Sequence, residues 1–76
     1  MNKESLQEYL AKRDEEDLRK CFEEYEELNR TGILKDGIAR KIEKWYKERY
    51  SIIGSVLETV RNAIYYEMAM RFYDQL

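Results

Sequence analysis

The fold is decided by residues 37–73, which read GIARKIEKWYKERYSIIGSVLETVRNAIYYEMAMRFY. Apolar residues recur there at spacings of three and four, which is the period of one face of an α-helix. At about 100° per residue they fall within a stripe roughly 120° wide. The stripe consists of Ile38, Ile42, Trp45, Tyr46, Ile53, Val56, Leu57, Val60 and Ile64. Because no proline interrupts it, the stretch predicts one long helix over 37–74, about 55 Å in length.

A break near Gly54 is the alternative to a continuous helix. Glycine inside a helix costs about 1 kcal/mol relative to alanine. Ser55 and Glu58 also have the spacing of a capping box, in which the serine hydroxyl accepts from the Glu58 amide. A loop at this point would usually reset the phase of the apolar stripe, and the phase is kept. The sequence therefore favours a continuous helix, with a monomeric three-helix bundle broken near Gly54 as the alternative.

A second amphipathic segment precedes the long one. Its apolar face consists of Leu18, Cys21, Phe22, Tyr25 and Leu28, which follow one another at helical spacing. Ser5 and Glu8 form a capping box that predicts a helix over 6–30. Asp14, however, would lie in the middle of the apolar stripe of such a helix, and it can instead cap a second start. The sequence leaves these two alternatives open.

The end of this first helix carries a specific stop signal. Gly32 can adopt the left-handed conformation of a Schellman ending, with Ile33 packed against Leu28. Asp36 is the expected N-cap of the long helix, which leaves a connection of about four residues. A connection this short favours antiparallel helices. The sequence therefore predicts an all-α fold, a helical hairpin formed by a single domain over residues 1–76.

Residues 64–73 are apolar around nearly the whole helix, and one partner helix cannot cover such a surface. A chain of 76 residues buries only about 60–65% of its unfolded surface, and its single cysteine excludes an intrachain disulfide. The predicted oligomer interface consists of Ile64, Tyr65, Tyr66, Met68, Met70, Phe72 and Tyr73. We expect a homodimer, or a higher homo-oligomer, in which two hairpins form a four-helix bundle.

Few residues offer catalytic chemistry. The chain has no histidine, which removes the commonest general base and metal ligand. Cys21 lies on the apolar face of its helix, so we expect it to be buried and unreactive. The carboxylates of residues 23–27 are expected on a solvated face, outside the core where pKa values shift. The prediction is a protein that is not an enzyme and that uses no cofactor, no metal and no small-molecule substrate.

Two charged faces remain as candidates for partner binding. The candidate acidic face consists of Glu16, Glu23 and Glu27, and the candidate basic face consists of Arg40, Lys41, Lys44 and Lys47. The preferred hypothesis is a non-enzymatic, self-associating protein-interaction module whose acidic face makes it an adaptor or an inhibitor of a basic protein. The alternative is a small nucleic-acid-binding regulatory protein, whose basic face follows a phosphate backbone.

The overall composition favours a cytoplasmic protein. No apolar run approaches the ~20 residues of a membrane span. The first four residues are polar and lack the apolar core of a signal peptide. We therefore expect no membrane partner.

Overall fold

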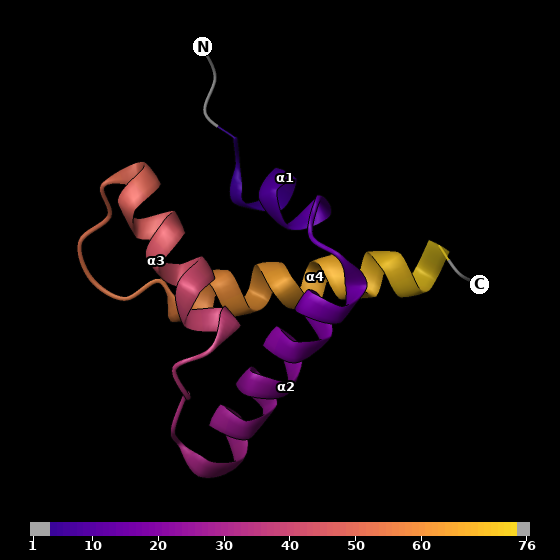
Figure 1. Cartoon of the computed structure of the whole chain (residues 1–76), viewed down its shortest axis with the longest axis horizontal. Coiled ribbons are helices and arrows are strands. Elements are labelled where there is room, and N and C mark those ends of the chain that lie inside the picture. Colours follow the sequence, from indigo (N-terminus) through magenta and orange to yellow (C-terminus); the bar gives the residue numbers. More distant parts are fainter. Residues whose placement is uncertain (1–3, 75–76) are drawn as a thin grey trace.

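The computed structural model describes residues 4–74, which form four α-helices and their connections (Figure 1). The helices are α1 (Leu6–Ala11), α2 (Glu15–Thr31), α3 (Ile38–Tyr50) and α4 (Leu57–Asp74). The part of the chain that the structure describes contains no strand, so the all-α prediction is confirmed. In Figure 1, α4 runs across the middle, with α1 on one side and α2 on the other. α4 contacts all three other helices, and the Cα atoms span 36 × 35 × 16 Å, which is a flat shape.

α1 and α2 are separate helices, so the prediction of one helix over 6–30 is wrong and the alternative with a second start is correct. The Ser5 hydroxyl accepts from the Glu8 amide at 3.1 Å and caps α1. The Asp14 carboxylate accepts from the Asp17 amide at 2.8 Å and caps α2. Three acidic residues then fill the first turn of α2, where the helix dipole favours negative charge.

α2 ends at the predicted glycine. Gly32 is left-handed, with φ 81°, and its amide donates to the Leu28 carbonyl at 2.7 Å. The Ile33 amide donates to the Thr31 hydroxyl at 3.2 Å, and the Ile33 side chain is 70% exposed. The ending is thus the simpler left-handed motif with one 5→1 bond, and Ile33 is not buried against Leu28 as the Schellman motif would require.

The long helix is broken, so the prediction of a continuous helix over 37–74, and with it the hairpin, is wrong. α3 ends at Tyr50 and α4 begins at Leu57. Ser51 and Gly54 are both left-handed, with φ 53° and 101°. The Ser55 hydroxyl accepts from the Leu57 amide at 3.3 Å, one residue before the expected partner. The break folds α4 back, so that its inner face is buried against the chain's own helices, and hydrophobic burial of this kind outweighs the loss of one helical turn.

The core is formed by all four helices. Its buried apolar residues are Leu6, Leu10, Leu18, Cys21, Tyr25, Leu34, Ala39, Ile42, Val56, Val60 and Ile64. The apolar stripe predicted across 38–64 faces this core on both sides of the break, with one apolar exception: Ile53, in the connection, is 99% exposed. The ring of Tyr9 stacks on Trp45 with 3.8 Å between centroids, which joins α1 to α3.

The start of α3 is capped from another helix. Asp36, the predicted N-cap, is exposed, and the N-cap position is occupied by Gly37. Glu24 of α2, which is only 6% exposed, accepts from the Ile38 amide at 3.3 Å and from the Ala39 amide at 2.9 Å. The expectation of a solvated carboxylate is therefore wrong for Glu24, because the helix start offers it two amide donors and a favourable dipole.

Candidate functional site

The outer face of α4 changes character along the helix. Its first half exposes Glu58, Thr59 and Asn62, which are polar. Its second half exposes apolar and aromatic side chains. This second part, which we name the aromatic surface, consists of Tyr66, Ala69, Met70, Phe72 and Tyr73. Tyr66 is 58% exposed, Phe72 65% and Tyr73 72%, so large rings face solvent on a helix whose inner face is already buried.

The seven residues of the predicted oligomer interface divide between the core and this surface. Ile64 is fully buried within the protomer and contributes nothing to an outer face. Tyr65 and Met68 are half-buried against the core, and the Tyr65 ring lies 5.2 Å from that of Phe22. The other four predicted residues belong to the aromatic surface. The fold-back at Gly54 explains this division, because it gives α4 internal partners that a hairpin would lack.

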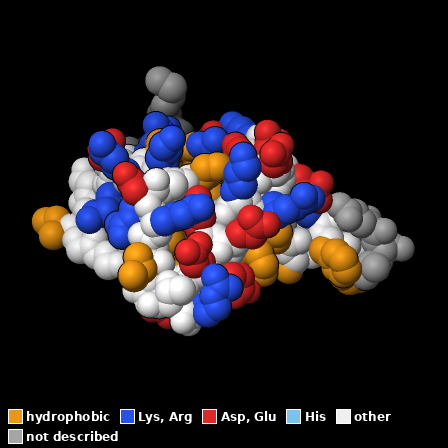
Figure 2. All heavy atoms as spheres, turned by 60° about the horizontal axis from the view of Figure 1, so that its bottom comes forward, with side chains coloured by type: hydrophobic (Ala, Val, Ile, Leu, Met, Phe, Trp, Pro, Cys, Tyr) orange, Lys and Arg blue, Asp and Glu red, His pale blue; other side chains and the backbone are white. Residues whose placement is uncertain are grey.

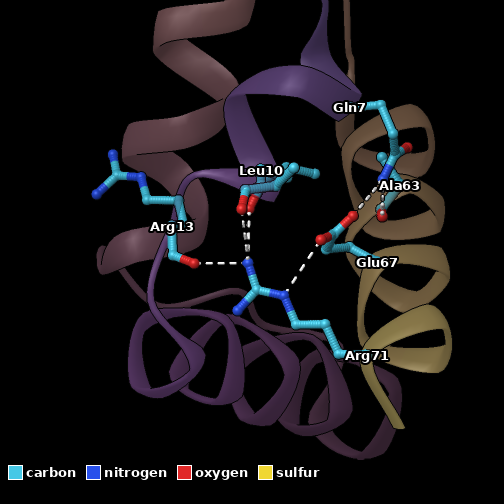
Figure 3. A network of polar contacts seen from close by, with 7 residues as sticks. Gln7, Leu10, Arg13, Ala63, Glu67 and Arg71 are labelled. Atoms are coloured by element: carbon cyan, nitrogen blue, oxygen red, sulfur yellow. Dashed lines mark hydrogen bonds and ion pairs between the residues drawn. The ribbon is translucent and has the colours of Figure 1, made fainter. Parts of the chain in front are cut away.

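A polar network fixes the helix that carries the aromatic surface (Figure 3). The Arg71 guanidinium donates through Nη2 to the carbonyls of Leu10 at 3.1 Å and Arg13 at 2.6 Å, and to that of Ala11 at 3.2 Å. Its Nε donates to Glu67 Oε1 at 3.1 Å, and Glu67 Oε2 accepts from Gln7. Arg71 thus joins α4 to carbonyls at the end of α1 and in the connection that follows it. The sequence reasoning missed this residue, although the Glu67–Arg71 spacing is that of a helical ion pair.

A small pocket adjoins the aromatic surface. It has a volume of about 100 Å³ and is lined by Glu15, Leu18, Met68, Arg71 and Phe72. Sites for small molecules are typically about 300–1,000 Å³. The pocket is large enough for one side chain of a protein partner.

The candidate acidic face is interrupted by lysines. Glu16 lies 3.7 Å from Lys20, as an exposed i,i+4 pair. Glu23 and Glu27 line a hollow together with Glu24, Lys20 and Lys35. The three predicted acidic residues therefore do not form one uninterrupted negative patch.

The candidate basic face is also of mixed charge. Arg40, Lys41, Lys44 and Lys47 line one open groove, and Asp36, Glu43 and Glu48 line it as well. The guanidinium of Arg40 donates to the Leu34 carbonyl at 3.1 and 3.2 Å. The face shown in Figure 2 likewise carries cationic and anionic side chains intermixed, with an apolar group beside the C-terminal end of α4.

The groups with reactive side chains are held in unreactive states. Cys21 is buried, as predicted, and burial, with smaller effects of the Glu24 and Asp17 carboxylates, raises its pKa to about 12. The thiol is therefore protonated at neutral pH. Burial also raises the pKa of Tyr25, whose hydroxyl donates to Glu43 at 2.6 Å. Within residues 4–74, no group of three or more Cys, Asp and Glu side chains is placed to hold a metal ion.

Comparison with known proteins gives no match: no family model, no curated protein and no solved structure is significantly similar to this chain. In the described residues, no helix is both long and apolar enough to cross a membrane.

Proposed function

We propose that this protein is a non-enzymatic, self-associating protein-interaction module, and that its binding site is the aromatic surface of α4. The observation that carries this proposal is the exposure of three large rings on one half of a rigidly held helix. Contiguous exposed apolar patches on small soluble proteins mark interaction sites. The Arg71 network supports the proposal, because a surface fixed before binding loses less entropy on association.

The preferred partner is a second copy of the chain. Tyr66, Ala69, Met70 and Tyr73 follow one another at helical spacings of three and four. When two such helices pack antiparallel about a two-fold axis, Tyr66 lies opposite Tyr73 of the second copy, and Ala69 lies opposite Met70. The small alanine then accommodates the methionine, and the rings pack at the two ends. The surface is self-complementary in this arrangement, which is what a two-fold interface requires.

The size of the surface predicts a weak dimer. At about 200 Å² for each ring, the exposed fractions of Tyr66, Phe72 and Tyr73 amount to on the order of 400 Å² per copy. With Ala69 and Met70 the pair buries on the order of 1,000 Å² in total, at the low end of specific interfaces. We therefore expect a reversible dimer with a dissociation constant on the order of 10 µM.

Sedimentation equilibrium tests this proposal. The parent chain should shift from monomer to dimer between about 1 µM and 1 mM. Met70→Glu and Tyr66→Glu each place a charge inside the interface, and both should remain monomeric over this range while circular dichroism shows them folded. Asn62→Glu is the matched control, because Asn62 lies on the polar half of the same outer face and its substitution should leave the equilibrium unchanged. A parent chain that stays monomeric at the highest concentration refutes the proposal.

A non-enzymatic role is supported by the protonated state of Cys21 and by the capping role of Glu24, both of which are structural. The acidic and basic faces support partner binding less well, because each contains side chains of both signs. Titration of labelled DNA and RNA at low salt tests the nucleic-acid alternative, since phosphate contacts are strongest there. Binding that is lost on Lys41→Glu and Lys44→Glu would place the basic face above the aromatic surface. A cytoplasmic location stays a prediction.

A further inference from the structure

The connection between α3 and α4 contains an isoleucine that the protomer does not use. Residues 51–56 reverse the chain and project at the left edge of the molecule in Figure 1. Ile53, at the centre of this connection, is 99% exposed. The reversal also requires Ser51 to be left-handed, which is unfavourable for a residue with a side chain. A connection that only reverses the chain needs neither an exposed isoleucine nor a left-handed serine.

The sequence around this connection retains the pattern of a continuous helix. Ile53 falls within the 120° stripe that runs from Ile38 to Ile64, and the residues of α3 and α4 on that stripe share one phase. A connection of six residues leaves the phase of the following helix free. By chance, the apolar face of the second helix would continue the 120° stripe of the first helix in about one of three orientations. The exposed Ile53 would in addition have to fall on the same stripe. Continuity of phase and the position of Ile53 therefore favour a state in which the connection is helical.

We propose that two copies of this chain exchange α4 through this hinge. In the exchanged dimer residues 51–56 become helical, α3 and α4 form one long helix, and the α4 segment of each copy packs against α1 and α2 of the other. Val56, Val60 and Ile64 keep the same kinds of neighbours that bury them in the protomer, which is why exchange of an identical element is a low-cost route to a dimer. The two long helices cross at the former connection, where Ile53 of each copy is buried beside the axis.

The hinge is the source of the free-energy difference between the two states. Helical residues 51–56 form backbone hydrogen bonds that the reversed connection lacks, and Ser51 returns to a right-handed conformation. Ile53 moves from solvent to an interface. Gly54 opposes the exchange, because glycine favours the left-handed conformation that it has in the protomer and disfavours a helix interior. The balance is therefore adjustable at three neighbouring residues.

This exchange goes beyond the proposed function and does not depend on it. The exchanged dimer uses residues 51–56 and leaves the aromatic surface of α4 exposed. The dimer proposed above uses the aromatic surface and leaves the connection reversed. Each mode is therefore sensitive to substitutions that do not affect the other, and both together would give a larger assembly.

Three variants with opposite expected effects test the hinge. Gly54→Ala replaces the residue that tolerates φ 101°, and the added Cβ would have no atom within 4 Å. The substitution therefore acts through the backbone alone. The dissociation constant of the exchanged dimer should fall at least 100-fold. Ser51→Gly should raise it about tenfold, since glycine favours the reversed connection. Ile53→Ala should raise it about 100-fold, tenfold for each copy, without destabilising the protomer, in which this side chain is exposed.

Crosslinking shows which chain supplies α4. Arg61 of α4 donates to Asn29 of α2 at 3.3 Å in the protomer. With Asn29→Cys and Arg61→Cys, a short bis-maleimide joins the two residues within one chain in the protomer and in the aromatic-surface dimer. It joins two chains in the exchanged dimer. Cys21 does not interfere, because it is buried. Gly54→Ala refolded at high concentration should give crosslinked dimers on a denaturing gel.

The exchange is overturned by a folded Gly54→Ala variant that is crosslinked only within chains at millimolar concentration. If Gly54→Ala does not fold, the parent chain decides: equal association of the parent and of Ile53→Ala, with crosslinks confined to single chains, also overturns it. Met70→Glu added to Gly54→Ala should leave the interchain crosslink intact, because the exchanged dimer does not use the aromatic surface. Loss of the interchain crosslink in this double variant would overturn the exchange as a mode that is independent of the aromatic surface.

Discussion

Gly37→Ala tests the capping of α3 by Glu24 most directly. A Cβ at residue 37 would lie 2.2 Å from Glu24 Oε2 and 2.8 Å from Glu24 Cδ, which is far inside contact distance. The φ of Gly37 is −131°, so the substitution tests the space beside the carboxylate and not a left-handed backbone. Because the carboxylate is the end of a flexible side chain, it can rotate away. The cost in stability is the loss of the hydrogen bonds that this carboxylate accepts from the start of α3.

The magnitude follows from the contacts that Glu24 makes. It accepts from the Ala39 amide at 2.9 Å and from the Ile38 amide at 3.3 Å, so one hydrogen bond is strong and the other is long. Hydrogen bonds to charged groups contribute about 1.5–3 kcal/mol, and a helix cap contributes about 0.5–2 kcal/mol. Gly37→Ala should therefore lower the free energy of unfolding by about 2–3 kcal/mol. A chain of this length has a total on the order of 4–11 kcal/mol.

A double-mutant cycle separates this mechanism from a general effect of the substitution. Urea unfolding followed by the fluorescence of Trp45, the single tryptophan, gives each free energy of unfolding under dilute, monomeric conditions. In a Glu24→Ala background the Cβ of residue 37 has no carboxylate to displace, so only the difference between glycine and alanine at an N-cap should remain, below about 1 kcal/mol. An equal loss in both backgrounds refutes the reasoning, because the two residues would then act independently.

Three further predictions concern single residues. Gly32→Ala should lower the free energy of unfolding by about 1–2 kcal/mol, measured by urea unfolding; the cost is purely conformational, because φ is 81° and a Cβ there would meet no atom within 4 Å. Arg71→Met removes the donor to the carbonyls of Leu10 and Ala11 at the end of α1 and of Arg13 just after it. Hydrogen exchange should therefore accelerate in α1 much more than in α3, and equal acceleration in both helices would contradict this role. Burial raises the pKa of the Cys21 thiol from 9.0 to about 12 in the folded protein. The buried neutral thiol therefore contributes its full stabilisation below pH 9.0, and this contribution to the free energy of unfolding should be lost as the pH rises toward 12. That loss is about 1.4 kcal/mol per pH unit, and a Cys21→Ala variant should show a shallower slope between pH 9 and 11.

The features that the sequence predicts correctly depend on local chemistry. Gly32 ends α2 because a left-handed residue satisfies the last carbonyls, and this holds in any tertiary context. The N-cap of α2 at Asp14, one of the two alternatives, likewise depends only on neighbouring residues. The exposed rings of Tyr66, Phe72 and Tyr73 follow from a segment that is apolar around nearly the whole helix, because a single layer of neighbouring helices cannot cover it.

The features that the sequence does not predict depend on the arrangement of the helices. At Gly54 the local signals are nearly balanced, and the retained phase of the stripe favours a continuous helix that the protomer does not form. Ile64 becomes a core residue because that break returns α4 to the other helices. Glu24 resembles its solvated neighbours in sequence, and its burial follows only from the position of Gly37 beside it. Tertiary contacts of this kind leave no periodic signal.

The contact of Arg71 with the end of α1 has a consequence for the order of folding during synthesis. Arg71 and Leu10 are 61 positions apart. A helix of six residues is far below the length that is stable alone in water. α1 is translated early but cannot form a lasting helix until the ribosome has added the last turns of α4, on the order of several seconds later at 5–20 residues per second. Leu6 and Leu10 therefore have no α4 to dock on during this interval, and once they have left the ribosome binding by chaperones competes with docking.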